Sequence, residues 1–196
     1  MTTTPDSRER LLKAANELFY RDGVGAVGVD KLCKAAGISK KSMYQLFDTK
    51  NDVVAAALER YGPWYLAMYL PDESDDRSPR DRVLHVFDWL DGRSSAPEFT
   101  GCPFVNIATE LRDPDHPAST VARRFKQHLT DFFERQAELG GAADPQLLAR
   151  QLTVVFDGAC ASAIVRAEGL AGLSRATAAA LLNAARMDTD PATTPR

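Results

Sequence analysis

The sequence has few of the features typical of secreted proteins, membrane-spanning proteins or proteins stabilised by disulfides or metal ions. It has three cysteines in 196 residues, Cys33, Cys102 and Cys160, and their odd number and wide spacing exclude a disulfide framework and a Cys-x-x-Cys metal site. No run approaches the roughly 18 consecutive apolar residues that a membrane span needs. The first residues also lack the basic and apolar regions of a secretory signal. We therefore expect a cytoplasmic protein without a membrane partner.

The net charge is small, −3, but it is unevenly distributed along the chain. Residues 1–60 contain 10 basic and 8 acidic side chains, whereas residues 61–196 contain 14 basic and 19 acidic ones. A mildly basic N-terminal segment followed by an acidic remainder is typical of a protein that meets an anionic partner with one end only.

Helical periodicity dominates the sequence and predicts an all-α fold. Apolar residues such as Leu11, Ala15 and Leu18 recur on one face of a helix over about residues 5–22, which Gly23 ends. A helix that starts near residue 50 should kink or break at Pro63. The same reasoning predicts further helices over about 29–36, 40–47, 80–91, 104–112, 117–139, 145–168 and 174–186. No segment alternates with a period of two beside a hairpin turn.

These elements predict two domains and a tail. Residues 1–48 form a three-helix, helix-turn-helix domain, and the helix starting near residue 50 links it to a helical bundle over residues 49–187. Residues 188–196 are polar and contain two prolines, so we expect a disordered tail.

The segment 29–47 carries the clearest functional pattern, two short helices across a turn that contains Gly37. Cys33 and Ala36 are small enough for the helices to cross closely. Four apolar residues seal the inner side: Leu32, Ile38, Met43 and Leu46. The other side chains of the second helix then lie on its outer face, namely Lys40, Lys41, Ser42, Tyr44 and Gln45. Such a face fits the major groove of DNA, and a merely solvated charged face is the alternative.

The chemistry of this face suggests separate roles. Gln45 and Lys41 lie one turn apart and are predicted to contact base edges, adenine and guanine respectively. Lys40, at the start of the helix, can contact a base or, as we favour, a phosphate. Lys50 lies at the N-terminus of the following helix, where a cation is unfavourable unless an anion binds. We therefore predict that Lys50 contacts a phosphate.

The N-terminal segment resembles the TetR family of bacterial transcriptional regulators. The resemblance is carried by residues 11–19, by Gly23, by 36–39, and by 43–47 followed by Lys50 and Val53. It implies a homodimer that binds a palindromic operator through an N-terminal domain and has a C-terminal domain for ligand binding and dimerisation. It also implies that the Tyr44 hydroxyl contacts a phosphate. Gly28 departs from the family, which usually has Ser or Thr before the second helix, so we expect weaker anchoring there.

The C-terminal part is expected to hold the effector and the dimer interface. Residues 101–106, with Glu110 and 113–117, resemble one branch of TetR-like C-terminal domains. A pocket for a small hydrophobic effector is predicted to be lined by Trp64, Met68, Trp89, Cys102, Phe104, Asn106 and Phe156; Cys102 could instead be structural or a redox sensor. The dimer interface is predicted on the last two long helices, with Leu148, Leu152, Val155, Ala159, Ser162 and Ala163 on one and Ala176, Ala179, Ala180 and Asn183 on the other.

The sequence therefore predicts a one-component transcriptional regulator, a repressor released from its operator by its effector. An activator or a ligand-insensitive regulator is the alternative within this class. An enzyme with Cys102 as nucleophile would lack a positioned base and would leave the helix-turn-helix unused. A helical interaction scaffold that merely shares the bundle is the other alternative. We predict no cofactor and no metal, since Asp113, Asp115 and His116 alternate with prolines and suit a turn better than a metal site.

Overall fold

Helices make up the regular secondary structure of the computed structural model, which describes residues 6–187. No strand occurs in that range. Nine helices are found there, and they confirm the all-α prediction: α1 (Ser7–Asp22), α2 (Val29–Ala36), α3 (Lys40–Leu46), α4 (Lys50–Tyr69), α5 (Pro79–Arg93), α6 (Pro103–Leu111), α7 (Pro117–Leu139), α8 (Pro145–Arg166) and α9 (Leu173–Ala184). The predicted tail, 188–196, lies outside the described residues.

Local capping determines where the N-terminal helices begin and end. The Asp6 carboxylate accepts the Glu9 backbone N–H at 2.8 Å, so α1 starts two residues later than predicted. Gly23, with φ 82°, ends α1 as expected. At the start of α4, the Thr49 N–H donates to Asp52 Oδ2 at 2.9 Å and the Asp52 N–H donates to Thr49 Oγ1 at 3.1 Å. This reciprocal arrangement is a capping box with Asp in the third position.

Helix α4 continues through Pro63 to Tyr69, so of the two outcomes predicted for Pro63, a kink or a break, the break is wrong. A proline inside a helix removes one backbone hydrogen bond and crowds the preceding turn. Here buried side chains on both sides, Leu58 before it and Tyr69 after it, hold the helix in place. Packing of an apolar face generally contributes more to a helix in a protein than local propensity does.

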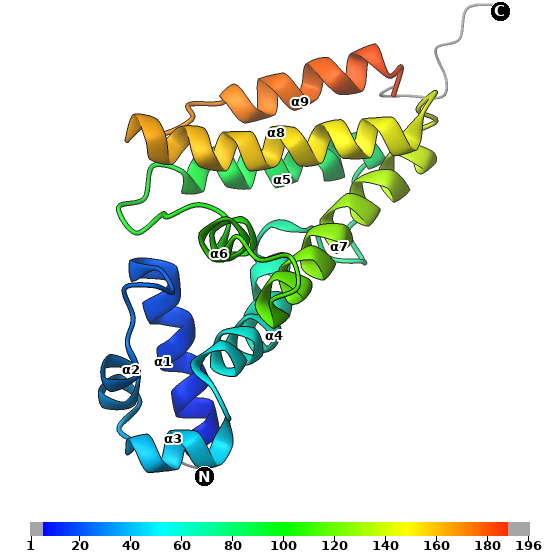
Figure 1. Cartoon of the computed structure of the whole chain (residues 1–196). Coiled ribbons are helices and arrows are strands. Elements are labelled where there is room, and N and C mark those ends of the chain that lie inside the picture. The colour runs from blue at the N-terminus through cyan, green and yellow to red at the C-terminus, as the bar shows by residue number, and fades with distance from the viewer. Residues whose placement is uncertain (1–5, 188–196) are drawn as a thin grey trace, which may run out of the picture. The chain divides into compact units, whose positions relative to one another are not determined.

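Two compact units divide the chain, one of residues 1–64 and 102–125 and the other of 65–101 and 126–196. In the first unit, α1, α2 and α3 pack against one another (Figure 1). The rings of Phe104 on α6 and Phe125 on α7 are nearly parallel, with centroids 5.1 Å apart. The core of the helix-turn-helix is formed by Leu11, Leu12, Leu18, Phe19, Leu32, Met43, Val53 and Val54. The domain boundary predicted at residue 48 stays a prediction.

The second unit is built around α5, α8 and α9, which pack together (Figure 1). The rings of Phe87 and Phe133 stack at 5.7 Å, and Phe156 meets Phe87 edge-on at 6.4 Å. The Ser174 hydroxyl donates to Asp91 Oδ1 at 2.7 Å and so ties the start of α9 to α5.

Helix α8 is apolar on both faces, and among the described residues it is long and apolar enough to cross a membrane by length and composition alone. One face lies in the core of the second unit and contains Leu148, Ala149, Leu152, Phe156, Cys160 and Ala163. The opposite face is exposed, with Val154 70% and Val165 84% accessible. Three residues of the predicted dimer interface, Leu148, Leu152 and Ala163, are therefore core residues of the protomer.

Candidate nucleic-acid interface

The turn between α2 and α3 has the geometry that the sequence predicted. Gly37 adopts the left-handed conformation, with φ 64° and ψ 39°, and the Ile38 N–H donates to the Cys33 carbonyl at 3.0 Å. This closure of the helix end requires a residue that tolerates positive φ. Cys33 and Ala36 are buried at the crossing of the two helices. Burial raises the pKa of the Cys33 thiol, so the residue acts as a small apolar packing group.

The inner side of α3 is sealed less completely than predicted. Met43 is fully buried and Ile38 is half-buried, but Leu46 is 38% exposed. Phe47, half-buried just after the helix, has the Arg8 guanidinium 5.4 Å from its ring centroid. The assignment of Leu46 to the seal was therefore wrong: α3 is only seven residues long, and Leu46 is its last residue.

The outer face of α3 is open to solvent, as a groove-binding surface must be. Lys40, Lys41 and Gln45 are exposed, and Tyr44 is 51% accessible. Lys41 and Gln45 are four residues apart and thus neighbours on the helix surface. These side chains present two ammonium groups, one amide and one hydroxyl on the outer face of the helix.

Two residues of this face already have partners in the protein. The Ser39 hydroxyl accepts the Ser42 N–H at 3.0 Å, and the two hydroxyls are 2.8 Å apart, so Ser42 completes the N-terminal cap of α3. Lys40 Nζ lies 2.8 Å from Asp30 Oδ1, and the hydrogen bond to this carboxylate raises the pKa of Lys40. Both partners are well exposed, so the Lys40–Asp30 ion pair adds little stability and can open when an anion binds.

Lys50 lies at the start of α4, and its amine is directed to backbone carbonyls. Its Nζ donates to the Val24 carbonyl at 2.8 Å and to the Val27 carbonyl at 3.2 Å. An ammonium group carries three donors, so one more remains for an anion. The sequence predicts only the phosphate contact. The hydrogen bonds from Lys50 to the loop between α1 and α2 join residues far apart in the chain, so only the folded structure shows them.

Glu110 on α6 binds backbone N–H groups of the same loop, a role that no pattern in the sequence predicts. Its carboxylate accepts the Val24 N–H at 2.8 Å and the Gly25 N–H at 2.6 Å. A Cβ built on Gly25 would lie 3.1 Å from Glu110 Oε1, which favours glycine there. Glu110 and the two amides are about 85 residues apart in the sequence. The resemblance of the C-terminal segment to TetR-like domains includes Glu110 but does not predict this contact.

The residues predicted to line an effector pocket fall into both compact units. Trp64, Cys102, Phe104 and Asn106 belong to the first unit, in which Trp64 is 55% exposed and Phe104 is fully buried against Phe125. Cys102 is buried at the start of α6. Phe104 and Cys102 thus occupy packed positions, and the effector role of this group stays a prediction.

The remaining predicted pocket residues, Met68, Trp89 and Phe156, lie in the second unit. Phe156 is buried, with its ring centroid 5.1 Å from that of Tyr69, and Tyr69 in turn lies 5.4 Å from Trp89. These contacts form an aromatic cluster, and the effector role of Met68, Trp89 and Phe156 stays a prediction. A cavity of this unit with a different lining is described below.

The acidic turn before α7 has the capping role that its prolines suggest. The Asp113 carboxylate accepts the Asp115 N–H at 2.9 Å, and His116 Nδ1 accepts the Ala118 N–H at 3.0 Å. Over residues 6–187 there is no group of three His, Cys, Asp or Glu side chains that could hold a metal ion.

The helix-turn-helix and the helical fold are shared with known proteins. The family model described as "Bacterial regulatory proteins, tetR family" matches residues 11–57, which contain the helix-turn-helix. A TetR-type regulator from Streptomyces avermitilis has a crystal structure that is 51% identical, with a TM-score of 0.90 over 94% of this chain and 100% of that chain.

Relatives in other bacteria are also transcriptional regulators. The transcriptional regulator AcuR of Cereibacter sphaeroides is 30% identical over 164 residues, which are 78% of this chain and 74% of AcuR. The transcriptional repressor NemR of Escherichia coli is 29% identical over 113 residues, 57% of each chain. With the exposed outer face of α3 on a helix-turn-helix, these matches show that the chain belongs to the TetR family of bacterial transcriptional regulators and is a DNA-binding regulator.

Proposed function

We propose that the protein is a cytoplasmic, homodimeric repressor that binds a palindromic operator and leaves it when a small molecule binds to the C-terminal part of the chain. The observation that carries the proposal is the solvent-open face of α3, with Lys41, Tyr44 and Gln45 exposed on a helix whose inner side is anchored by Met43. A short helix held in this way can enter the major groove without any change in its own packing.

The contacts with DNA divide by chemistry. Gln45 and Lys41 reach base edges, and Tyr44 and Lys40 contact phosphates, Lys40 after its pair with Asp30 opens. Ser42 contributes through the cap that orders the start of α3. Lys50 uses its third donor on a phosphate while its other two hold the loop between α1 and α2.

The exposed face of α8 supports the dimer. Leu147, Val154 and Val165 recur along one side of α8 and are 50%, 70% and 84% accessible, and Leu173 at the start of α9 is 61% accessible. Such a stripe of large apolar side chains is costly in water and is typical of a helix-to-helix subunit interface. Within α9, the predicted Ala176, Ala180 and Asn183 are also exposed. A palindromic operator has two half-sites about 34–36 Å apart, and a dimer supplies one α3 helix for each of them.

The release step is supported by the contact between α6 and the DNA-binding end of the first unit. Glu110 holds the amides of Val24 and Gly25, in the loop that directly precedes α2. A shift of α6 would therefore break two charge-assisted hydrogen bonds at the base of the helix-turn-helix. NemR is named a repressor, which favours repression over activation for this chain.

The decisive experiment is a mobility-shift titration of the full chain with the DNA upstream of its own gene and with random DNA of equal length. We expect a specific complex, and Gln45→Ala should weaken operator binding by about 1–3 kcal/mol while leaving random DNA almost unaffected. Lys41→Ala should behave in the same way.

The matched control is Gln127→Ala, which makes the same change at an exposed glutamine on α7 and should leave both affinities unchanged. If Gln45→Ala lowers binding to operator and random DNA equally, Gln45 is a backbone contact. If the chain does not shift any upstream DNA, the repressor assignment is wrong.

A further inference from the structure

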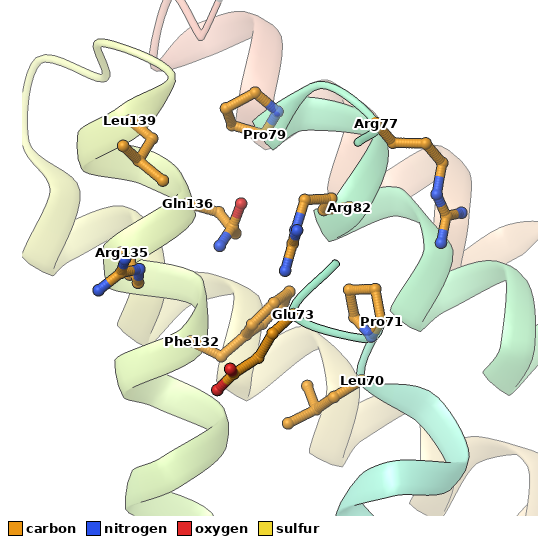
Figure 2. A pocket seen from close by; sticks show the side chains of 10 residues that line it. All are labelled: Leu70, Pro71, Glu73, Arg77, Pro79, Arg82, Phe132, Arg135, Gln136 and Leu139. Atoms are coloured by element: carbon orange, nitrogen blue, oxygen red, sulfur yellow. The ribbon is translucent and has the colours of Figure 1, made fainter. Parts of the chain in front are cut away.

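A cavity of about 610 Å³ lies in the second unit, where the end of α4 and the following loop meet the start of α5 and the end of α7. Its volume is within the range of about 300–1,000 Å³ typical of small-molecule sites. Figure 2 shows the side chains that line it. None of the seven residues that the sequence predicted for an effector pocket is among them, so this cavity is a different candidate site.

Two polar atoms in the wall of this cavity are buried and have no hydrogen-bond partner among the described residues. One is Oε1 of Gln136, a residue only 2% exposed, and the other is Nε of Arg82. Figure 2 shows both side chains directed into the space between α5 and α7. Buried polar atoms in folded proteins nearly always have partners, so two such atoms in one cavity indicate where the polar end of a ligand lies.

The two atoms need opposite kinds of partner. Gln136 Oε1 is a carbonyl oxygen, which accepts a hydrogen bond and needs a donor, whereas Arg82 Nε carries a hydrogen and needs an acceptor. A carboxylate has only acceptors and would leave the Gln136 oxygen without a partner. An ammonium group has only donors and would leave Arg82 Nε without one. A polar end that has both a donor and an acceptor satisfies both atoms.

The loop between α4 and α5 holds Arg82 in this position. Its Nη1 donates to the Asp75 carbonyl at 2.6 Å, so turning Nε away from the cavity would break this hydrogen bond. Arg77, which also lines the cavity, forms an ion pair with the Asp75 carboxylate, and its hydrogen bond holds the pKa of that carboxyl well below its usual range. The Arg77 charge is therefore compensated within the loop.

The other charges of the lining are mixed in sign. Glu73 and Arg135 are both exposed, and the Arg82 guanidinium adds a second positive charge. An anionic ligand would share the cavity with Glu73, and a cationic one would share it with Arg82 and Arg135, so either ion meets a like charge. An uncharged ligand avoids both repulsions and costs less free energy to transfer out of water than an ion does.

The rest of the lining is largely apolar. Leu70, Pro71 and Phe132 form one stretch of wall, and Pro79 and Leu139 lie toward the other end (Figure 2). A site of this kind, with apolar walls and a few convergent polar groups, selects a ligand that has an apolar body and one polar end.

We propose that this cavity binds an uncharged ligand with an apolar body and a carboxamide end. The carbonyl oxygen of the ligand accepts from Arg82 Nε, and its N–H donates to Gln136 Oε1, so that both buried atoms gain a partner. The apolar body lies along Leu70 and Phe132. Binding itself does not depend on the proposed repressor function; only the role of this ligand as the effector rests on it.

The test measures binding to the full chain by isothermal titration calorimetry in the absence of DNA. The probes are octanamide, octanoate and the octylammonium ion, which have alkyl chains of similar length. We expect octanamide to bind at least tenfold more tightly than either ion, because each ion leaves one buried atom without a partner. If either ion binds as tightly as octanamide, the proposal is wrong. Absence of octanamide binding would also overturn it and would leave the two atoms to water or to each other.

The variant Gln136→Leu removes the acceptor at nearly constant volume. It should weaken octanamide binding at least tenfold and leave octanoate affinity unchanged, because octanoate has no donor for the Gln136 oxygen. A merely structural role of Gln136 would lower both affinities alike, and that result or an unchanged octanamide affinity would refute the site. The matched control Gln127→Leu, at an exposed position of the same helix, should change neither affinity.

The variant Arg82→Lys tests the other contact and stays informative if Gln136→Leu does not fold. Lysine keeps the positive charge but has a methylene group where arginine has Nε. Octanamide affinity should again fall at least tenfold, with circular dichroism as the check that the variant is folded. Unchanged octanamide affinity in a folded Arg82→Lys variant would show that Nε does not bind the ligand.

A mobility shift with the operator then separates the two proposals. Octanamide that binds and releases DNA supports both the site and its regulatory role. Octanamide that binds without releasing DNA supports the site and shows that the effector is another molecule, whereas loss of DNA binding in every condition would concern the repressor assignment alone.

Discussion

Replacing Glu110 by glutamine tests whether α6 controls the loop that supports the recognition helices. The carboxylate accepts two backbone N–H groups, from Val24 at 2.8 Å and from Gly25 at 2.6 Å. A glutamine of the same length has one acceptor oxygen and turns its NH₂ toward the second amide. The variant therefore keeps one neutral hydrogen bond and loses the other.

The size of the effect follows from the two kinds of hydrogen bond. A hydrogen bond to a charged group contributes about 1.5–3 kcal/mol and a neutral one about 0.5–1.5 kcal/mol. Glu110 is exposed, so water screens its charge and the lower part of the range applies. We expect a local loss of about 1–2 kcal/mol, a factor of about 5–30 in the opening equilibrium of the loop.

Amide hydrogen exchange followed by NMR measures this opening directly. In Glu110→Gln the amides of Val24 and Gly25 should exchange about 5–30 times faster, while amides in the α1 core keep their protection. The control Glu138→Gln makes the same change at an exposed glutamate of α7 and should leave all these amides unaffected. Unchanged exchange at Val24 and Gly25 in Glu110→Gln would refute the reasoning.

Three further predictions concern packing, assembly and pH. Gly62→Ala places a Cβ against Cζ of the buried Phe125, so urea unfolding should show a loss of about 1–3 kcal/mol in the free energy of unfolding; a gain, as helix propensity alone predicts, would contradict this. Val154→Glu should convert a dimer into a monomer in light scattering with unchanged circular dichroism, and a persistent dimer would exclude this face. The hydrogen bonds from Arg21 and Lys31 hold the pKa of Asp22 well below its usual range. The stability that the ionised carboxylate contributes to the folded state is therefore complete above its unfolded pKa of about 3.9, and it is lost as the pH falls below that value. Acid unfolding curves of the wild type and Asp22→Asn should therefore differ above about pH 4 and converge below it.

Local chemistry made much of the fold predictable from the sequence. The turn between α2 and α3 needs a residue that tolerates positive φ, and Gly37 is that residue. Asp52 caps α4 through Thr49, three residues before it. These interactions span only a few residues, so they act in the same way before and after the chain folds. The helix-turn-helix and its exposed residues, Tyr44 among them, therefore follow from the sequence.

Contacts between distant segments were decided only by the tertiary structure. Pro63 lies inside α4 because side chains on both sides of it are buried by other helices. Lys50 donates to carbonyls 23 and 26 residues away, and Glu110 accepts amides about 85 residues away. No local pattern encodes such partners.

The two faces of α8 also show that a local sequence pattern does not determine which residues become buried. Leu148 and Val154 are both apolar and both suit a helix interface, so the sequence pattern cannot assign one to the core and the other to solvent. Adjacent residues on a helix point about 100° apart, and an error of one position exchanges an inner face for an outer one. Composition and periodicity determined that α8 is an apolar helix, but packing against α5 and α9 determined that Leu148 is buried and Val154 is exposed.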